Sequence, residues 1–305
     1  MNTRNLSYKC PIVAPKYYKN FRCIADKCRH SCCLGWEIDV DDAAVEKYRA
    51  CENPYKTVVV DSIEYDGSTH HFKLLDDERC PHLDERGLCR IITELGEGYL
   101  CDICREHPRF YNRVFDTLEV GIGLSCEEAA RIVLGSDEYD ELILCGEVFL
   151  ESEPFDFDVR KPREQVFSIL SDSSLPYAER IKRIREDFDL PADIVPDILW
   201  REAINRLEYL NEDNRQIFSG YTSDLDTAPE MEKFLERALA YFVYRHCSSA
   251  ENETEFRVSL GVSLFLERLL ASVSDEKNIF DRARIISEEI EYSVDNIEEL
   301  KLLLY

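Results

Sequence analysis

Cysteine is the residue type whose spacing has the clearest chemical meaning in this sequence, because ten of the thirteen cysteines lie between Cys23 and Cys126. The first group reads Cys23-(x4)-Cys28-(x3)-Cys32-Cys33, so four thiols fall within eleven residues. If the span from Cys28 to Cys32 is helical, these two thiols lie one turn apart and can reach a single metal centre. A thiol-rich core segment is the alternative, but so dense a group favours metal ligands.

A second group of thiols follows further along the chain. Cys80 and Cys89 flank a loop, Cys101 and Cys104 form a C-x2-C pair, and Cys126 precedes an expected helix. The pair alone fits a zinc knuckle or a redox dithiol. Structural zinc takes four ligands, whereas the nine thiols of the two groups suit either two zinc sites or an iron–sulfur cluster with further ligands nearby. We interpret the two groups as a metal site, with iron–sulfur as the first assignment and zinc as the alternative.

Other residues near these cysteines carry weaker signals. His82 and His107 are possible nitrogen ligands, although hydrogen bonding beside the site is the favoured interpretation. The Gly121–Gly123 turn between a strand and a helix suggests a nucleotide-binding loop, but two glycines without the rest of a βαβ unit are weak support. The histidines and cysteines that stand apart are expected to have no special role: His70, His71, Cys10, Cys51, Cys145 and Cys247.

The overall composition indicates a folded protein of the cytoplasm. A chain of 305 residues with 45% hydrophobic composition can bury a full core. The net charge of −25 argues against binding to nucleic acid or to an anionic membrane. The opening segment has no apolar run long enough for a signal peptide or a membrane span. In the reducing cytoplasm, disulfides would not account for thirteen cysteines.

The local patterns predict a mainly α fold of the α+β class, in two domains. Residues 1–150 are expected to form a cysteine-rich metal-binding domain with a small antiparallel hairpin or sheet. This part should contain a helix over 39–51, a hairpin over 56–75 that turns at Asp66-Gly67, and a strand over 117–125 before a helix from Cys126.

Residues 151–305 are expected to form a helix bundle. An acidic, proline-bearing stretch that begins at residue 151 marks the boundary between the two domains. Apolar residues then recur three and four apart in six segments, 162–172, 176–189, 196–212, 228–247, 254–274 and 281–304.

Three stretches resemble one known family. They are the run FRCIADKCRHSCCLGWEIDVD at 21–41, the run CPHLDERGLCRIITELGEGYLCDICREHPRFYN at 80–112, and the run GLSCEEAARIVL at 123–134. In order and spacing they resemble the flagellin lysine-N-methylase family and its cysteine-rich zinc- or iron-chelating domain. The likeness covers residues 14–135, while the helical remainder matches only in general character.

The resemblance implies transfer of a methyl group from S-adenosylmethionine to surface lysines of flagellin, in an enzyme with an iron–sulfur cluster. A zinc- or iron-binding protein without catalysis, or a redox sensor, is the alternative. The spacing departs from the C-x3-C-x2-C loop of radical enzymes, and neither a catalytic base nor a cofactor pocket can be assigned. Eight cysteines take the positions of the family's motif, with Cys101 as a further candidate: Cys23, Cys28, Cys32, Cys33, Cys80, Cys89, Cys104 and Cys126.

Overall fold

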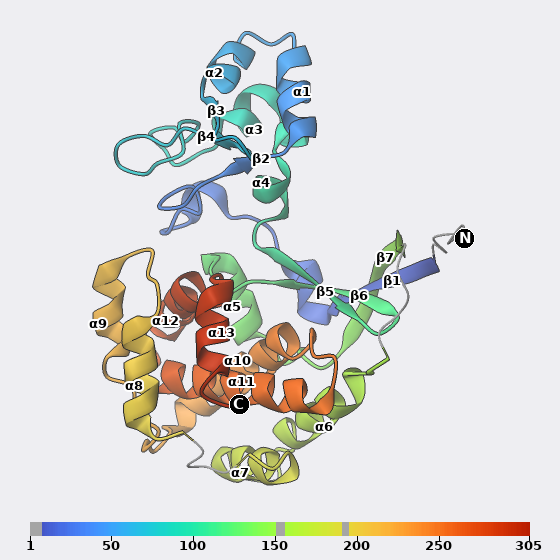
Figure 1. Ribbon diagram of the computed structural model, residues 1–305, viewed down its shortest axis with the longest axis vertical. Helices are drawn as coiled ribbons and strands as arrows, with labels where there is room; N and C mark the ends of the chain where they lie inside the picture. The colour runs from blue at the N-terminus through green and yellow to red at the C-terminus, as the bar shows by residue number, and fades with distance from the viewer. Residues whose placement is uncertain (1–7, 151–155, 191–194) are drawn as a thin grey trace. The chain divides into compact units, whose positions relative to one another are not determined.

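The computed structural model describes residues 8–150, 156–190 and 195–305, and the chain divides into two compact units (Figure 1). The small unit is Arg22–Arg109, and the large unit combines the residues up to Phe21 with Phe110–Tyr305. This division differs from the predicted boundary at residue 150, because the strands on either side of the small unit pair with each other and so belong with the helices that follow. The first part of the predicted linker, residues 151–155, lies outside the described residues.

The small unit contains short helices and a three-stranded antiparallel sheet in the order β2-β4-β3. The predicted first helix is confirmed, since the Asp41 carboxylate accepts the Ala44 N–H at 2.8 Å and starts α1 there. The elements are η2 (Ala25–Lys27), β2 (Asp39–Val40), α1 (Asp42–Ala50), α2 (Lys56–Asp61), β3 (Ile63–Tyr65), β4 (His70–Phe72), α3 (Arg90–Leu95), η3 (Glu97–Tyr99) and α4 (Asp102–Glu106).

The predicted hairpin is confirmed in its second part and wrong in its first. Strands β3 and β4 pair around a turn in which the Asp66 side chain accepts the N–H groups of Ser68 and Thr69. Residues 56–61, however, form helix α2 and not a strand. Tyr55 and Val59 are both buried, and their i, i+4 spacing places both side chains on one face of the helix.

The large unit contains a mixed four-stranded sheet in the order β5-β6-β1-β7. Strand β1 runs parallel to β6 and antiparallel to β7, with Tyr8 opposite Leu150 and Pro15 opposite Leu142. The predicted strand before Cys126 is confirmed as β6, whereas β1, β5 and β7 were not predicted. Their bounds are β1 (Tyr8–Pro15), β5 (Arg109–Val114), β6 (Thr117–Ile122) and β7 (Leu142–Leu150).

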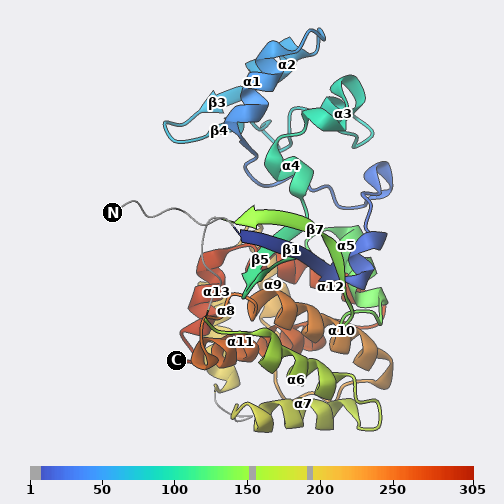
Figure 2. The same ribbon diagram turned by 90° about the vertical axis from the view of Figure 1, so that its right-hand side faces the viewer.

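Helices make up most of the rest of the large unit and confirm five of the six predicted segments, while the sixth, 281–304, contains two helices separated by the π-turn Ser287–Glu291. The sheet lies along one side of them (Figure 2), and Tyr244 on α10 donates to the Val120 carbonyl of β6 at 3.2 Å. No helix in the described part of the chain is long and apolar enough to cross a membrane. The elements are η1 (Lys16–Asn20), α5 (Glu127–Gly135), α6 (Arg160–Leu170), α7 (Tyr177–Asp187), α8 (Asp197–Arg206), η4 (Glu212–Asn214), α9 (Arg215–Phe218), α10 (Pro229–His246), α11 (Glu253–Val273), α12 (Ile279–Ile286), the π-turn Ser287–Glu291 and α13 (Val294–Lys301).

A buried ion pair ties the sheet to these helices. The Arg163 guanidinium of α6 donates to both carboxylate oxygens of Glu119 on β6, at 2.5 and 2.6 Å. The two side chains are 3% and 0% exposed, and the Ser248 hydroxyl accepts from Arg163 at 2.8 Å. Because water is excluded, each charge depends on the other for its solvation.

A second buried group joins the end of α10 to the π-turn. His246 Nε2 lies 2.8 Å from Oε1 of Glu291. Arg245 lies 3.5 Å from the same oxygen, and the Tyr241 hydroxyl donates to Oε2 at 3.4 Å. Burial lowers the pKa of His246, and this effect outweighs the opposing influence of Glu291. His246 is therefore neutral in the folded protein at neutral pH, with Nε2–H as the donor to Glu291.

We expect the stability of the large unit to fall as the pH drops below about 6.5, the ordinary pKa of histidine. Below that value the unfolded chain binds a proton at His246 that the folded chain does not, so protonation favours unfolding. One such proton changes the free energy of unfolding by at most about 1.4 kcal/mol per pH unit. Urea unfolding of His246→Gln and the parent chain between neutral and mildly acidic pH measures this, and the variant should show the shallower dependence. Equal slopes would mean that His246 does not contribute.

Candidate metal centre

Two extended segments of the small unit bring the two cysteine groups together. The Cys80 N–H donates to the Cys33 carbonyl at 2.9 Å, and Leu34 and Arg79 form an antiparallel bridge beside them. Cys33 and Cys80 are thus neighbours although 46 residues separate them in sequence. The first and second groups therefore meet in space, as a shared metal site requires.

The C-x2-C pair joins the same cluster. Cys101 precedes α4, Cys104 lies within it, and the two thiols are close enough to shift each other's pKa. The neighbouring Cys104 thiol lowers the pKa of Cys101, and Cys101 in turn raises the pKa of Cys104. Charges on Cys33 and Cys80 also raise the pKa of Cys104, so these thiols lie within electrostatic range of it.

Cys32 and Cys89 complete the group. Burial raises the pKa of Cys80 to about 11, and the charges of Cys89, Cys101 and Cys32 act in the same direction. Burial likewise raises the pKa of Cys89, with Cys101 and Cys32 again among the causes. The thiol cluster, as we call it from here on, consists of Cys32, Cys33, Cys80, Cys89, Cys101 and Cys104.

Asp41 connects the helices on which this cluster depends. One carboxylate oxygen caps α1 through the Ala44 N–H, and the other accepts the Asp102 N–H at the start of α4, each at 2.8 Å. Although burial opposes it, these backbone hydrogen bonds hold the pKa of Asp41 below its usual value. Asp41 thereby positions Cys101 and Cys104 against α1.

We expect Asp41→Ala to lower the free energy of unfolding of the small unit by about 0.5–2 kcal/mol, the usual cost of losing a helix cap. Trp36 lies in the small unit and Trp200 in the large one, and the sequence has no other tryptophan. Urea unfolding followed by the fluorescence of Trp36, in a Trp200→Phe background, isolates the small unit. Asp39→Ala, on an exposed side chain of β2, is the matched control. A cost no larger than that of the control would contradict this role for Asp41.

Three predicted ligands lie outside the thiol cluster. Cys23 is exposed, the Cys28 thiol donates to the His30 carbonyl at 2.7 Å, and Cys126 caps α5 in the large unit. The span from Cys28 to Cys32 is not helical, so the one-turn spacing considered for these two thiols is wrong. Metal ligation by these three outer cysteines stays a prediction.

His82 has the hydrogen-bonding role that was favoured for it. It is fully buried, with Nδ1 2.9 Å from the Tyr55 hydroxyl and Nε2 3.0 Å from the Ser62 hydroxyl. Burial, together with the charge of Arg90, lowers its pKa to about 4. Both ring nitrogens are engaged, so this neutral imidazole supports the loop after Cys80 and is not placed to bind a metal.

The other weak signals have structural explanations. His70 and His71 lie on β4 beside Asp42 and Glu37, at 3.2 and 3.4 Å. The ring of Phe110 packs directly on the backbone of Gly121, where a Cβ would clash with it. Gly121 lies within strand β6 and not in a turn, and the close-packed ring, not a nucleotide, accounts for this glycine.

The six thiols of the cluster are ligands that zinc or iron prefers, but their side chains are not arranged around one point as in a formed metal site. No three Cys, His, Asp or Glu side chains among the described residues converge closely enough to hold an ion. The six thiols are neighbours that form no disulfide, and thiolates select zinc or iron over calcium or magnesium. The buried Tyr48 hydroxyl beside the cluster has no hydrogen-bond partner in the described part of the chain.

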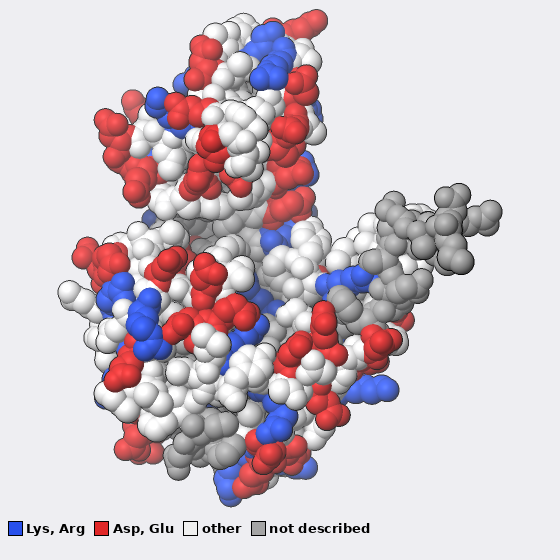
Figure 3. Space-filling view, in the orientation of Figure 1, with Lys and Arg blue, Asp and Glu red and all other residues white. Residues whose placement is uncertain are grey.

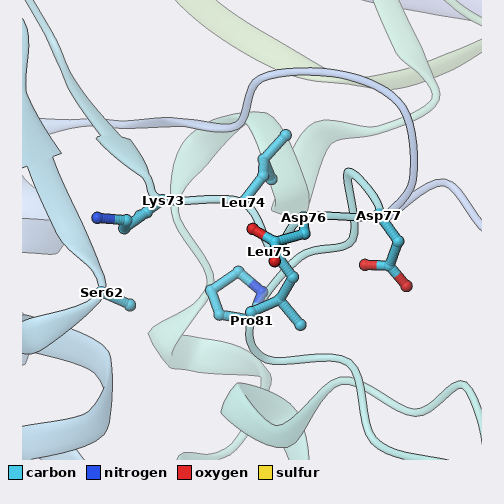
Figure 4. Close-up of a pocket in the computed structure, with 7 residues that line it drawn as sticks. All are labelled: Ser62, Lys73, Leu74, Leu75, Asp76, Asp77 and Pro81. Atoms are coloured by element: carbon cyan, nitrogen blue, oxygen red, sulfur yellow. The ribbon is translucent and has the colours of Figure 1, made fainter.

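A groove of about 520 Å³ lies next to the thiol cluster in the small unit. Figure 4 shows Leu75 and Pro81 between Lys73 on one side and Asp77 on the other. Lys73 is paired with Glu64 at 2.9 Å, whereas Asp76 and Asp77 form no ion pair with any described residue. An apolar floor with two unpaired carboxylates suits a long side chain that ends in a cation. The groove is lined by Ser62, Lys73, Leu74, Leu75, Asp76, Asp77 and Pro81.

Comparison with known proteins gives relatives that match part of the chain. The chain is 29% identical over 133 residues to lysine-N-methylases of Salmonella choleraesuis and Salmonella typhimurium, which covers 42% of this chain and 33% of each relative. It is 28% identical over 133 residues to the flagellar biosynthetic protein FliU of Salmonella muenchen, covering 42% of this chain and 79% of that protein. The match thus spans about a third of the length of these lysine-N-methylases. No protein-family model and no solved structure matches the chain.

Proposed function

These relatives confirm the expected likeness to the flagellin lysine-N-methylase family, and from it we propose that the chain is a protein-lysine N-methyltransferase. The methyl donor would be S-adenosylmethionine, and the substrate would be surface lysines of flagellin. The observation that carries the proposal is the similarity over 133 residues to two proteins named lysine-N-methylase. The name of the third relative, a flagellar biosynthetic protein, supports a flagellar substrate.

The thiol cluster would hold an iron–sulfur cluster in this enzyme, with zinc as the alternative. Its six thiols come from four segments of one compact unit, and they are the soft ligands that either metal prefers. A bound metal would cross-link these loops and so stabilise the small unit. Cys23, Cys28 and Cys126 remain candidates for additional ligands. A chain with thirteen cysteines also suits the cytoplasm, where thiols are kept free.

Methyl transfer to a lysine requires a place where the lysine-bearing segment can dock, and residues of this chain could provide it. The amine must lose its proton and be held in line with the methyl group, and the proton needs an acceptor. The carboxylates of Asp76 and Asp77 beside an apolar floor provide a docking place for a lysine-bearing segment. Across the face shown in Figure 3, Asp and Glu are widespread while Lys and Arg lie scattered among them, which favours a cationic partner over nucleic acid.

The direct test is an assay with purified flagellin under anaerobic, reducing conditions. The metal-loaded protein is incubated with S-adenosylmethionine that carries a deuterated methyl group, and flagellin peptides are analysed by mass spectrometry. We expect deuterated methyl groups on lysine, and none when either the enzyme or the donor is omitted. Unmodified flagellin in the complete reaction would contradict methyl transfer and would favour a metal-binding or redox-sensing protein.

A further inference from the structure

Tyr48 is the one tyrosine of the small unit whose hydroxyl is buried without a hydrogen-bond partner among the described residues. It lies on α1, is 0% exposed, and its ring packs against Phe72 at 6.4 Å between centroids. Tyr55, by comparison, is also buried, but its hydroxyl is bound to His82 at 2.9 Å. An unsatisfied buried hydroxyl costs about 1–3 kcal/mol, so its retention calls for an explanation.

The surroundings of Tyr48 identify the missing acceptor. The core of the small unit joins Tyr48 to Cys80 and Cys101, with Cys104 packed against them. Burial is the main reason why the pKa of Tyr48 is raised, and the next causes are the charges of Cys101 and Cys104. The nearby carboxylate of Asp41 already accepts two backbone N–H groups. The thiols of Cys101 and Cys104 are thus acceptors that belong to the same core as the Tyr48 ring.

A neutral thiol is a weak acceptor, whereas a metal-bound thiolate is a strong one. The Tyr48 hydroxyl is buried without a partner among the described residues, in the same core as Cys101, and is therefore placed to donate to such a thiolate. We propose that Tyr48 donates its O–H to a metal-bound thiolate of the Cys101–Cys104 pair and thereby positions and tunes the metal centre. This inference rests on the proposed metal site and assigns Tyr48 a role in binding, independent of the reaction that the protein catalyses.

The test compares Tyr48→Phe with the parent chain in metal-free and metal-loaded form. Removing the hydroxyl should leave the metal-free protein as stable as the parent or more stable, because an unpaired polar group is lost. In the loaded form the variant should bind zinc about 10- to 100-fold more weakly in competition with a chelator, as is usual when a donor to a metal ligand is removed. After loading with ferrous iron and sulfide, its reduction potential should become more negative, because hydrogen bonds to sulfur favour the reduced state.

Two matched variants provide controls. Tyr65→Phe removes an exposed hydroxyl from the same unit and should change neither affinity nor potential. Tyr55→Phe removes a hydroxyl that is already bound to His82, so it should destabilise the metal-free protein, opposite to the effect of Tyr48→Phe. If Tyr48→Phe has the zinc affinity and the reduction potential of the parent, the role of Tyr48 is overturned while the proposed metal site still stands. A parent chain that takes up neither zinc nor iron would overturn the metal site as well.

Discussion

Replacing Cys33 or Cys104 with alanine is expected to abolish stoichiometric metal binding and to unfold much of the small unit in the metal-loaded protein. Both residues belong to the thiol cluster, and removal of one ligand from a site that is coupled to folding removes the stabilisation by the metal. For structural zinc in small domains, that stabilisation is about 10–16 kcal/mol. Metal content and the urea midpoint, followed by Trp36 fluorescence in a Trp200→Phe background, measure both effects.

Other cysteines provide the comparison for this prediction. Cys145→Ala changes an exposed thiol on β7 of the large unit and should alter neither property. Cys23→Ala and Cys126→Ala then decide whether the outer cysteines are ligands, since loss of metal in either would extend the site beyond the six thiols. Full metal content and unchanged stability in Cys33→Ala or Cys104→Ala would mean that the wrong ligands have been chosen.

Replacing Glu119 with alanine is expected to lower the free energy of unfolding of the large unit by about 3–5 kcal/mol. The change leaves the Arg163 guanidinium, 3% exposed, buried without its carboxylate. The Ser248 hydroxyl at 2.8 Å and the Tyr244 ring at 5.1 Å, both uncharged, would still contact the guanidinium. Urea unfolding followed by Trp200, with Trp36→Phe as background, isolates the large unit.

The matched control for this pair is Lys9→Ala. Lys9 pairs with Glu147 between β1 and β7 of the same sheet, but the two side chains are 58% and 48% exposed. An exposed pair of this kind contributes no more than about 1 kcal/mol. If Glu119→Ala costs as little as the control, the buried pair does not hold the sheet to the helices.

The helices could be predicted from the sequence because their signals are local. Apolar residues three and four apart predicted α6, α7, α8, α10 and α11, which all lie where the pattern placed them. Strand β1 could not be predicted in the same way. It contains two prolines, and its partners β6 and β7 lie more than a hundred residues further along the chain. Its pairing draws residues before the small unit into the large one, which is why composition alone misplaced the boundary.

The candidate site could be predicted as a set of residues but not as an arrangement. Spacing along the chain identified the cysteines, yet it ranked Cys101 below Cys23, whereas the structure buries Cys101 in the thiol cluster and exposes Cys23. The C-x2-C spacing was the available signal for Cys101. Tyr48 gave no signal, since its position beside the thiols depends on contacts between distant segments, such as the Asp41 hydrogen bond that joins the start of α1 to the start of α4.

The central claim is that the six thiols of the small unit form one metal centre. Measuring iron, acid-labile sulfide and zinc per chain, in protein purified without oxygen, tests it most directly. We predict a stoichiometric content of iron with sulfide, and visible absorption that disappears together with the metal in Cys104→Ala. Stoichiometric zinc without sulfide would support the metal centre but would mean that it holds zinc and not an iron–sulfur cluster. Folded, metal-free protein that takes up neither metal on reconstitution would contradict the claim.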